Sequence, residues 1–133
     1  MTGYLLDANV LIAATVAEHE HHDRVTSWIA GIGAFATCPV VEGALTRFLL
    51  RMGESAATAM AVLSGVQSHP GSEFWPDSLS YADVDLTTIH GHRQVTDTYL
   101  AALAQEHGAQ LATLDTALAR RHPDHCLLVP AGS

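Results

Sequence analysis

Four acidic residues stand where a short apolar stretch of the sequence ends or where a helical pattern begins. Asp7, Glu42 and Asp115 each follow a short apolar stretch and precede a helical pattern, and Asp97 opens a further helical pattern. Two carboxylates about 4 Å apart repel each other by roughly 4 kcal/mol at an effective dielectric constant near 20. A divalent cation offsets that repulsion, and carboxylate oxygens without a neighbouring cysteine suit Mg²⁺ or Mn²⁺. Such ions activate water and support the hydrolysis of a phosphodiester.

The elements that must position these acids alternate between short strands and helices. The apolar spacing predicts strands at residues 4–6, 34–37, 74–75, 110–114 and 126–129. It predicts helices at residues 8–14, 18–29, 39–49, 55–67, 79–89, 96–107 and 116–120. This order favours one α/β domain over residues 1–133, a three-layer α/β/α sandwich with a short, mostly parallel sheet. The junctions at Asp7, Glu42 and Asp115 would then share the carboxyl edge of the sheet, where open α/β folds bind ligands.

Each acid also has a purely structural explanation. Asp7 and Asp115 suit N-cap positions, which stabilise a helix by about 0.5–2 kcal/mol relative to alanine. Glu42 and Asp97 fall in first helical turns, where the helix dipole favours a negative charge. For any single acid, the structural explanation is as good as a role as a metal ligand. The edge that several of them share favours the metal site.

The charge balance excludes several functions. The chain of 133 residues has 14 acidic residues and 6 basic ones, a formal net charge of −8, and all of its basic residues are arginine. Without a lysine it has neither a P-loop nor a Schiff base, and a phosphorylated receiver domain is disfavoured. A surface that holds nucleic acid by releasing bulk counterions is also disfavoured. An enzyme whose metal ions bridge protein and phosphate remains possible.

The remaining composition indicates a cytoplasmic protein. Apolar residues make up 48% of the chain, yet the apolar run at residues 8–17 is too short to cross a bilayer and has no basic flank. We therefore expect no membrane association. Cys38 and Cys126 stand apart, which favours buried thiols in a reducing compartment over a disulfide or a cysteine zinc site.

Three blocks of the sequence resemble those of PIN-domain ribonucleases, in particular the VapC-type toxins. The opening block reads LLDANVLI at residues 5–12, and the middle block reads TCPVVE at residues 37–42. The last block runs from TDTYLAALA at residues 96–104 through HGA at 107–109 to LATLD at 111–115. In this order the blocks cover most of the chain, and their combination is specific.

The resemblance implies a PIN-like fold and a metal-dependent endoribonuclease. It implies that Mg²⁺, with Mn²⁺ as a substitute, is held by Asp7, Glu42, Asp97 and Asp115. It implies that Asn9 and Thr113 orient the carboxylates or water beside the ion. The chain departs from the family pattern at Leu118, where many relatives have phenylalanine, and at Arg93 and Gln94, where some carry an extra acid. One or two metal ions therefore remain possible.

The resemblance also implies partners. These are a structured RNA substrate (tRNA prominently), a VapB-type antitoxin whose C-terminal segment covers the active-site groove, and a second copy of the chain in a homodimer. Metal-dependent phosphatases, deoxyribonucleases and non-catalytic binding modules on the same fold remain alternatives.

Arginines near the acids are candidates for contacts with RNA phosphates. Arg47 and Arg51 are spaced i, i+4 on the helix that carries Glu42, Arg93 precedes Asp97, and residues 120–121 are a further arginine pair. The forked donors of arginine suit phosphate oxygens. Scattered surface charge is the equally good alternative.

Overall fold

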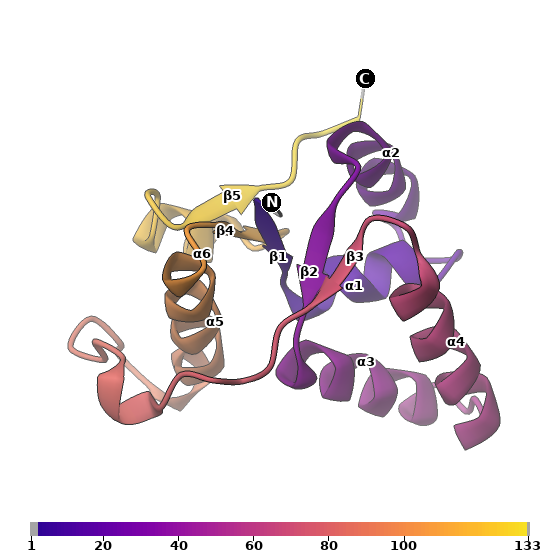
Figure 1. Cartoon of the computed structure of the whole chain (residues 1–133), viewed down its shortest axis with the longest axis horizontal. Coiled ribbons are helices and arrows are strands. Elements are labelled where there is room, and N and C mark those ends of the chain that lie inside the picture. The colour runs from indigo at the N-terminus through magenta and orange to yellow at the C-terminus, as the bar shows by residue number, and fades with distance from the viewer. Residues whose placement is uncertain (1–2, 133) are drawn as a thin grey trace.

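Five short strands form a single parallel sheet in the computed structural model, which describes residues 3–132 (Figure 1). The strands are β1 (Tyr4–Leu6), β2 (Phe35–Thr37), β3 (Ser72–Phe74), β4 (Gln110–Thr113) and β5 (Cys126–Leu128). They lie in the order β3-β2-β1-β4-β5, and each neighbouring pair is parallel. The first strand of the chain is thus the central one, and the predicted strand order along the sequence is confirmed.

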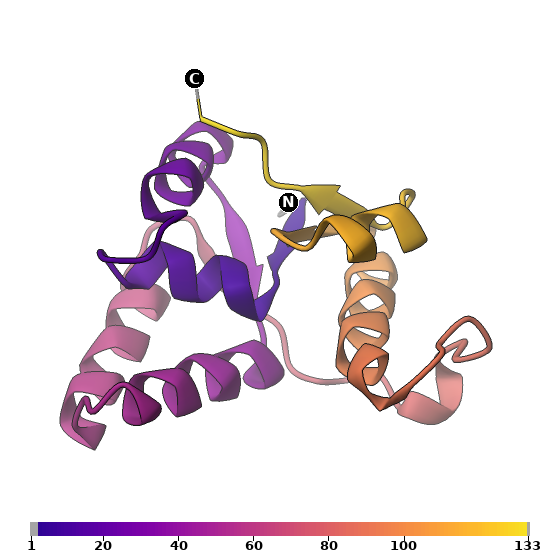
Figure 2. The same cartoon turned by 180° about the vertical axis from the view of Figure 1, so that it is seen from behind.

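Six helices flank this sheet in the described part of the chain. They are α1 (Ala8–Thr15), α2 (His22–Ile32), α3 (Pro39–Arg51), α4 (Ala56–Ser68), α5 (Val95–Glu106) and α6 (Thr116–Arg121). Two 3₁₀ turns, η1 (Tyr81–Asp83) and η2 (His92–Gln94), interrupt the long connection from β3 to α5. Helices α1 to α4 gather on one side of β1, and α5 and α6 on the other, as both views show (Figures 1 and 2). The predicted α/β/α architecture is confirmed.

The helix starts follow the capping residues of the sequence. Asp7 caps α1, Ser55 caps α4 by accepting a hydrogen bond from the Thr58 N–H (3.0 Å), and Asp115 caps α6. Pro39 occupies the first turn of α3, where its missing N–H leaves no helical bond unmade. Two of the four acids are therefore N-caps, as their structural explanation predicted.

Two of the predicted helices are wrong in part. The helix expected at residues 79–89 is absent apart from η1, because short polar side chains bind the backbone there: Asp85 Oδ1 accepts from both the N–H and the hydroxyl of Thr87. The helix expected at residues 18–29 begins only at His22. The preceding residues form a turn in which His19 Nδ1 accepts from the His21 N–H (3.0 Å).

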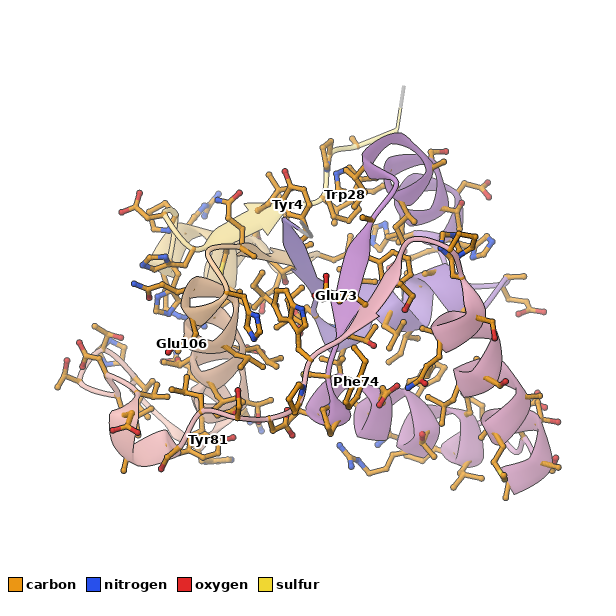
Figure 3. The ribbon with its side chains drawn as sticks, viewed as in Figure 1. Tyr4, Trp28, Glu73, Phe74, Tyr81 and Glu106 are labelled. Atoms are coloured by element: carbon orange, nitrogen blue, oxygen red, sulfur yellow. The ribbon has the colours of Figure 1, made fainter. Side chains whose placement is uncertain are left out.

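The core lies around β1, β4 and α5. Leu5, Leu6 and Leu111 are fully buried, and α5 is apolar on most of its circumference, as its sequence predicted. At the start of the central strand β1, the rings of Tyr4 and Trp28 meet edge to face with their centroids 5.2 Å apart (Figure 3). Among residues 3–132, no helix combines the length and apolar character needed to span a bilayer.

Close backbone packing at the entrance of β3 requires a glycine. A Cβ atom on Gly71 would lie 1.9 Å from the carbonyl oxygen of Gly33. We expect Gly71→Ala to lower the free energy of unfolding by about 1–3 kcal/mol, because the backbone must shift to make room. Urea denaturation measures this. Gly65→Ala is the control: it meets nothing within 4 Å inside α4, and should raise stability by about 0.5–1 kcal/mol. Equal urea midpoints for the two variants would contradict the close approach.

Candidate active site

The pairing of β1 with β4 places Asp7 beside Thr113. The Asp7 N–H donates to the Ala112 carbonyl (2.9 Å), which extends the ladder between the two strands by one residue. The side chain is 5% exposed, and both of its oxygens accept hydrogen bonds: Oδ2 from the Thr113 hydroxyl (2.9 Å) and Oδ1 from the Ala8 N–H (2.8 Å). The carboxylate of Asp7 is therefore fixed in place by its own strand, its neighbour strand and the start of α1.

Thr113 connects Asp7 to Asp115. While its hydroxyl donates to Asp7, the same oxygen accepts from the Asp115 N–H (3.0 Å). Asp115 Oδ1 accepts from the N–H groups of Ala117 (2.9 Å) and Leu118 (3.1 Å) as an N-cap. Its Oδ2 accepts no hydrogen bond from any residue in 3–132. One oxygen of this exposed carboxylate is thus held and the other remains available to a ligand.

Asp97 lies in the first turn of α5 and interacts electrostatically with both of these acids. Burial, followed by the negative charges of Asp7 and Asp115, raises the pKa of Asp97 to about 6, and the positive charge of Arg121 opposes the rise. Burial also raises the pKa of Asp7 against the hydrogen bonds from Thr113 and Ala8, and Asp115 adds to the rise. The charges of Asp7 and Asp115 therefore disfavour ionisation of Asp97, and the charge of Asp115 disfavours ionisation of Asp7.

Glu42 does not join this group. It lies in the first turn of α3, and its Oε2 accepts a hydrogen bond from the side-chain amide of Gln67 in α4 (2.9 Å). It is not among the charges that shift the pKa of Asp7 or Asp97. The structure thus brings together Asp7, Asp97 and Asp115, and leaves Glu42 bound to a neighbouring helix.

The donor set has the chemistry of a magnesium site. Carboxylate oxygens that repel one another and partly resist ionisation gain most from a bound divalent cation. Within residues 3–132, no three His, Cys, Asp or Glu side chains stand near enough to share a single ion. Joint binding therefore requires side-chain rotation, which Asp97 and Asp115 Oδ2 can supply, because no hydrogen bond holds them among the described residues.

The other predicted site residues are exposed. Asn9 is exposed in the first turn of α1, two positions beyond Asp7. Arg47, Arg51 and Arg93 are exposed, and none of them shifts the pKa of the acids. Arg51 lies in the last turn of α3, about 13 Å further along the helix axis than Glu42.

Arg121 is the arginine that acts on the acids, and the sequence distinguished it only weakly. It ends the short helix α6, and its charge lowers the pKa of Asp97. In the sequence it appears only as half of an arginine pair after Asp115. Its place six positions after an N-capping acid, at the end of the same short helix, was the signal that could have distinguished it.

A larger hollow in the molecule is separate from the acids. It has a volume of about 660 Å³ and lies between α1, α2, α4 and the sheet. Its walls are largely apolar, and none of Asp7, Glu42, Asp97 or Asp115 lines it. Its size alone therefore does not make it the catalytic site.

The repulsion among the acids has a consequence for stability without metal. Folding raises the pKa of Asp97 from its ordinary 3.8 to about 6, so the folded chain keeps a proton that the unfolded chain releases across this range. Wild-type stability in EDTA should therefore fall as pH rises from about 4 to 6. We expect Asp97→Asn to be more stable than wild type at pH 7, with the difference vanishing near pH 4. Thermal unfolding at several pH values measures it.

The control for this comparison is Glu106→Gln in the exposed last turn of the same helix (Figure 3). Its stability difference from wild type should stay nearly constant between pH 4 and 7. A constant difference for Asp97→Asn as well would show that Asp97 carries no raised pKa.

Comparison with known proteins gives one consistent family. The family model described as PIN domain matches residues 4–122. Ribonuclease VapC29 of Mycobacterium tuberculosis is 57% identical over 127 residues, which is 95% of this chain and 96% of that protein. Ribonuclease VapC39 of the same organism is 35% identical over 125 residues, which is 86% of this chain and 90% of that protein.

Solved structures share the fold at low sequence identity. One is the crystal structure of VapBC2 from Rickettsia felis bound to a DNA fragment from the VapBC2 promoter. A chain of that structure matches this one with a TM-score of 0.64 and 18% sequence identity. The match covers 94% of this chain and 96% of the chain in that structure. PAE2754 from Pyrobaculum aerophilum matches with a TM-score of 0.61 and 22% sequence identity. This match covers 94% of this chain and 83% of PAE2754. The sequence blocks, the sheet order and these relatives agree, and the chain belongs to the PIN-domain family, within its VapC type.

Proposed function

We propose that this protein is a metal-dependent endoribonuclease that hydrolyses phosphodiester bonds of RNA. The observation that carries the proposal is the raised pKa of Asp97 at the start of α5, which the charges of Asp7 and Asp115 after β1 and β4 help to raise. Such an arrangement is costly to keep unless a cation or a reaction uses it. Relatives that match over nearly the whole chain are named ribonucleases, which supports RNA as the substrate.

The residues have distinct roles in this proposal. Asp7, Asp97 and Asp115 would hold Mg²⁺, for which Mn²⁺ can substitute, and Glu42 would join them after releasing Gln67. A bound ion supplies an activated water and stabilises charge on the phosphodiester. Thr113 positions Asp7 and the Asp115 backbone through one hydroxyl. Asn9, two positions after Asp7, would orient a water or a phosphate oxygen.

The charge of the protein makes the metal important for substrate binding as well. With a net charge of −8 the surface repels RNA overall, so binding must come from local cations. Arg121 stands next to the acids, and Arg47, Arg51 and Arg93 are exposed on neighbouring elements. These arginines and the metal would bind phosphates on both sides of the cleaved bond.

The family membership supports a toxin–antitoxin context. We propose a VapB-type antitoxin as the inhibitory partner, a homodimer as the assembly, structured RNA such as tRNA as the substrate, and the cytoplasm as the place of action. The support is the VapC type of the chain and its structural similarity to a protein solved as VapBC2.

Metal binding is the first test of this assignment. We expect Mn²⁺ to bind the wild-type chain, and Asp7→Asn to weaken binding at least tenfold, because the variant removes a charged ligand whose hydrogen-bonded position is fixed. Isothermal titration calorimetry measures both. Asp23→Asn on the exposed face of α2 is the matched control and should bind like wild type. Equal affinity of wild type and Asp7→Asn would remove the proposed metal site.

RNA cleavage is the second test. Brief expression followed by sequencing of RNA 5′ ends should show new ends with the wild type, and their loss by at least roughly a hundredfold with Asp97→Asn. EDTA should abolish cleavage by the purified protein. Matched DNA and a small aryl phosphate are assayed in parallel, and turnover of either in preference to RNA would favour the deoxyribonuclease or phosphatase alternative. Unchanged ends in the variant would contradict the role of Asp97.

A further inference from the structure

A second, smaller cavity lies beside the acids and is built from three separate segments. It has a volume of about 240 Å³ and is enclosed by one face of α5, the irregular stretch after η1, and the turn after α6. Its lining residues are Val84, Asp85, Thr88, Thr98, Ala101, Ala102, Gln105, His122 and His125. It is smaller than the roughly 300–1,000 Å³ of pockets for drug-sized ligands, and several times the roughly 30 Å³ of a water molecule. One flat ring system matches this size.

Thr98 belongs to the wall of this cavity and carries an unsatisfied, buried polar group. It is 5% exposed, and its hydroxyl has no hydrogen-bond partner in the described chain. Three other helical threonines, Thr15, Thr26 and Thr46, donate their hydroxyls to carbonyls of the preceding turn, those of Leu11, His22 and Glu42. A buried hydroxyl left without a partner costs about 1–3 kcal/mol. Thr98 thus forgoes the usual bond at a position where a ligand could supply one.

The charge of the cavity favours an uncharged polar ligand. Burial, with the neighbouring Arg121 and His125, lowers the pKa of His122, so its imidazole is neutral at pH 7. Hydrogen bonds from Thr87 lower the pKa of Asp85, so that carboxylate is negatively charged. The negative charge of Asp85 in the wall disfavours a phosphate. Imidazole faces, amide and hydroxyl groups suit a planar ring with N–H donors and acceptors.

The cavity and the acids share their supporting elements. Thr98 directly follows Asp97 on α5, and His122 directly follows Arg121, whose charge acts on Asp97. The thiol of Cys126, next to His125, feels the charges of both Asp7 and Asp97. The start of α5 and the end of α6 thus contribute both to the surroundings of the acids and to the wall of the cavity.

We propose that this cavity binds an unpaired nucleobase of the RNA, next to the phosphodiester that is cleaved. The base would stack on His122 or His125 and bond through its edge to Thr98, Gln105 or Asp85. Recognition of RNA sequence commonly uses bases splayed out of the strand, stacked on aromatic rings and bonded at their edges. This inference rests on the proposed ribonuclease function and adds the feature that would select the cleavage site.

The test separates base binding from catalysis. The full-length protein in EDTA, where it cannot cleave, is titrated with RNA trinucleotides of varied central base and followed by NMR. We expect at least one central base to shift the signals of Thr98, Gln105 and the two imidazoles. Thr98→Val should weaken that binding about three- to tenfold, by the loss of one hydrogen bond. Ala102→Leu, which fills the cavity, should abolish it.

We expect the Thr98→Val variant to fold like the wild type. Valine replaces a buried, unpaired hydroxyl by a methyl group, which is neutral or stabilising, and thermal unfolding verifies it. Thr26→Val in α2 is the matched control, outside the cavity, and should bind trinucleotides like wild type.

Cleavage maps complete the test. If the wild type cleaves RNA, Thr98→Val should change the nucleotide preference beside the cut and lower kcat/KM at preferred sites more than at others. Unchanged preference together with absent trinucleotide shifts would overturn the inference and leave the ribonuclease assignment standing. Base-dependent shifts at Thr98 in a protein that fails to cleave RNA would support the cavity and contradict the ribonuclease.

Discussion

The site depends on the parallel pairing of β1 with β4. These strands hold only three and four residues, yet their register sets Leu6 against Ala112 and lets the Asp7 N–H continue the ladder. That register brings the Asp7 carboxylate to the Thr113 hydroxyl, and through Thr113 to the Asp115 backbone. Because side chains alternate along a strand, a slip of one residue would turn Asp7 to the opposite face of the sheet. The buried leucines on both strands hold the register in place.

The negative charges at the ends of these strands oppose the stability of the folded protein. Asp7 is buried as an acid with two hydrogen bonds and no arginine or lysine bound to it among the described residues. Asp97 keeps its carboxylate next to two others, and only Arg121 offsets their charge. A protein selected only for stability would place amides or apolar groups here. The arrangement is understandable if a divalent cation supplies the missing positive charge.

Helix α5 connects the acids to the rest of the molecule. It is buried around most of its surface, so its rotation about its own axis is determined by packing in the core. Consecutive positions on this rigid helix present Asp97 to the acids and Thr98 to the smaller cavity. The irregular connection before α5, visible in Figure 1 as a loop that extends away from the sheet, closes the other side of that cavity. One helix thereby carries both a proposed metal ligand and a proposed contact to the substrate.

The sequence by itself determined the alternation of strands and helices, the capping roles of Asp7 and Asp115, and the buried character of α5, because these follow from local periodicity and short-range hydrogen bonds. It also predicted that Asp7, Glu42 and Asp115 share one edge of the sheet and that Asp97 opens a buried helix. Only the tertiary structure decided that Glu42 bonds to Gln67, that Arg121 is the arginine acting on Asp97, and that Thr98 faces a cavity. It also decided that Asp85 and Thr87 replace a predicted helix with a turn. Contacts between segments far apart in the chain leave no local period, so their partners emerge only when the elements pack.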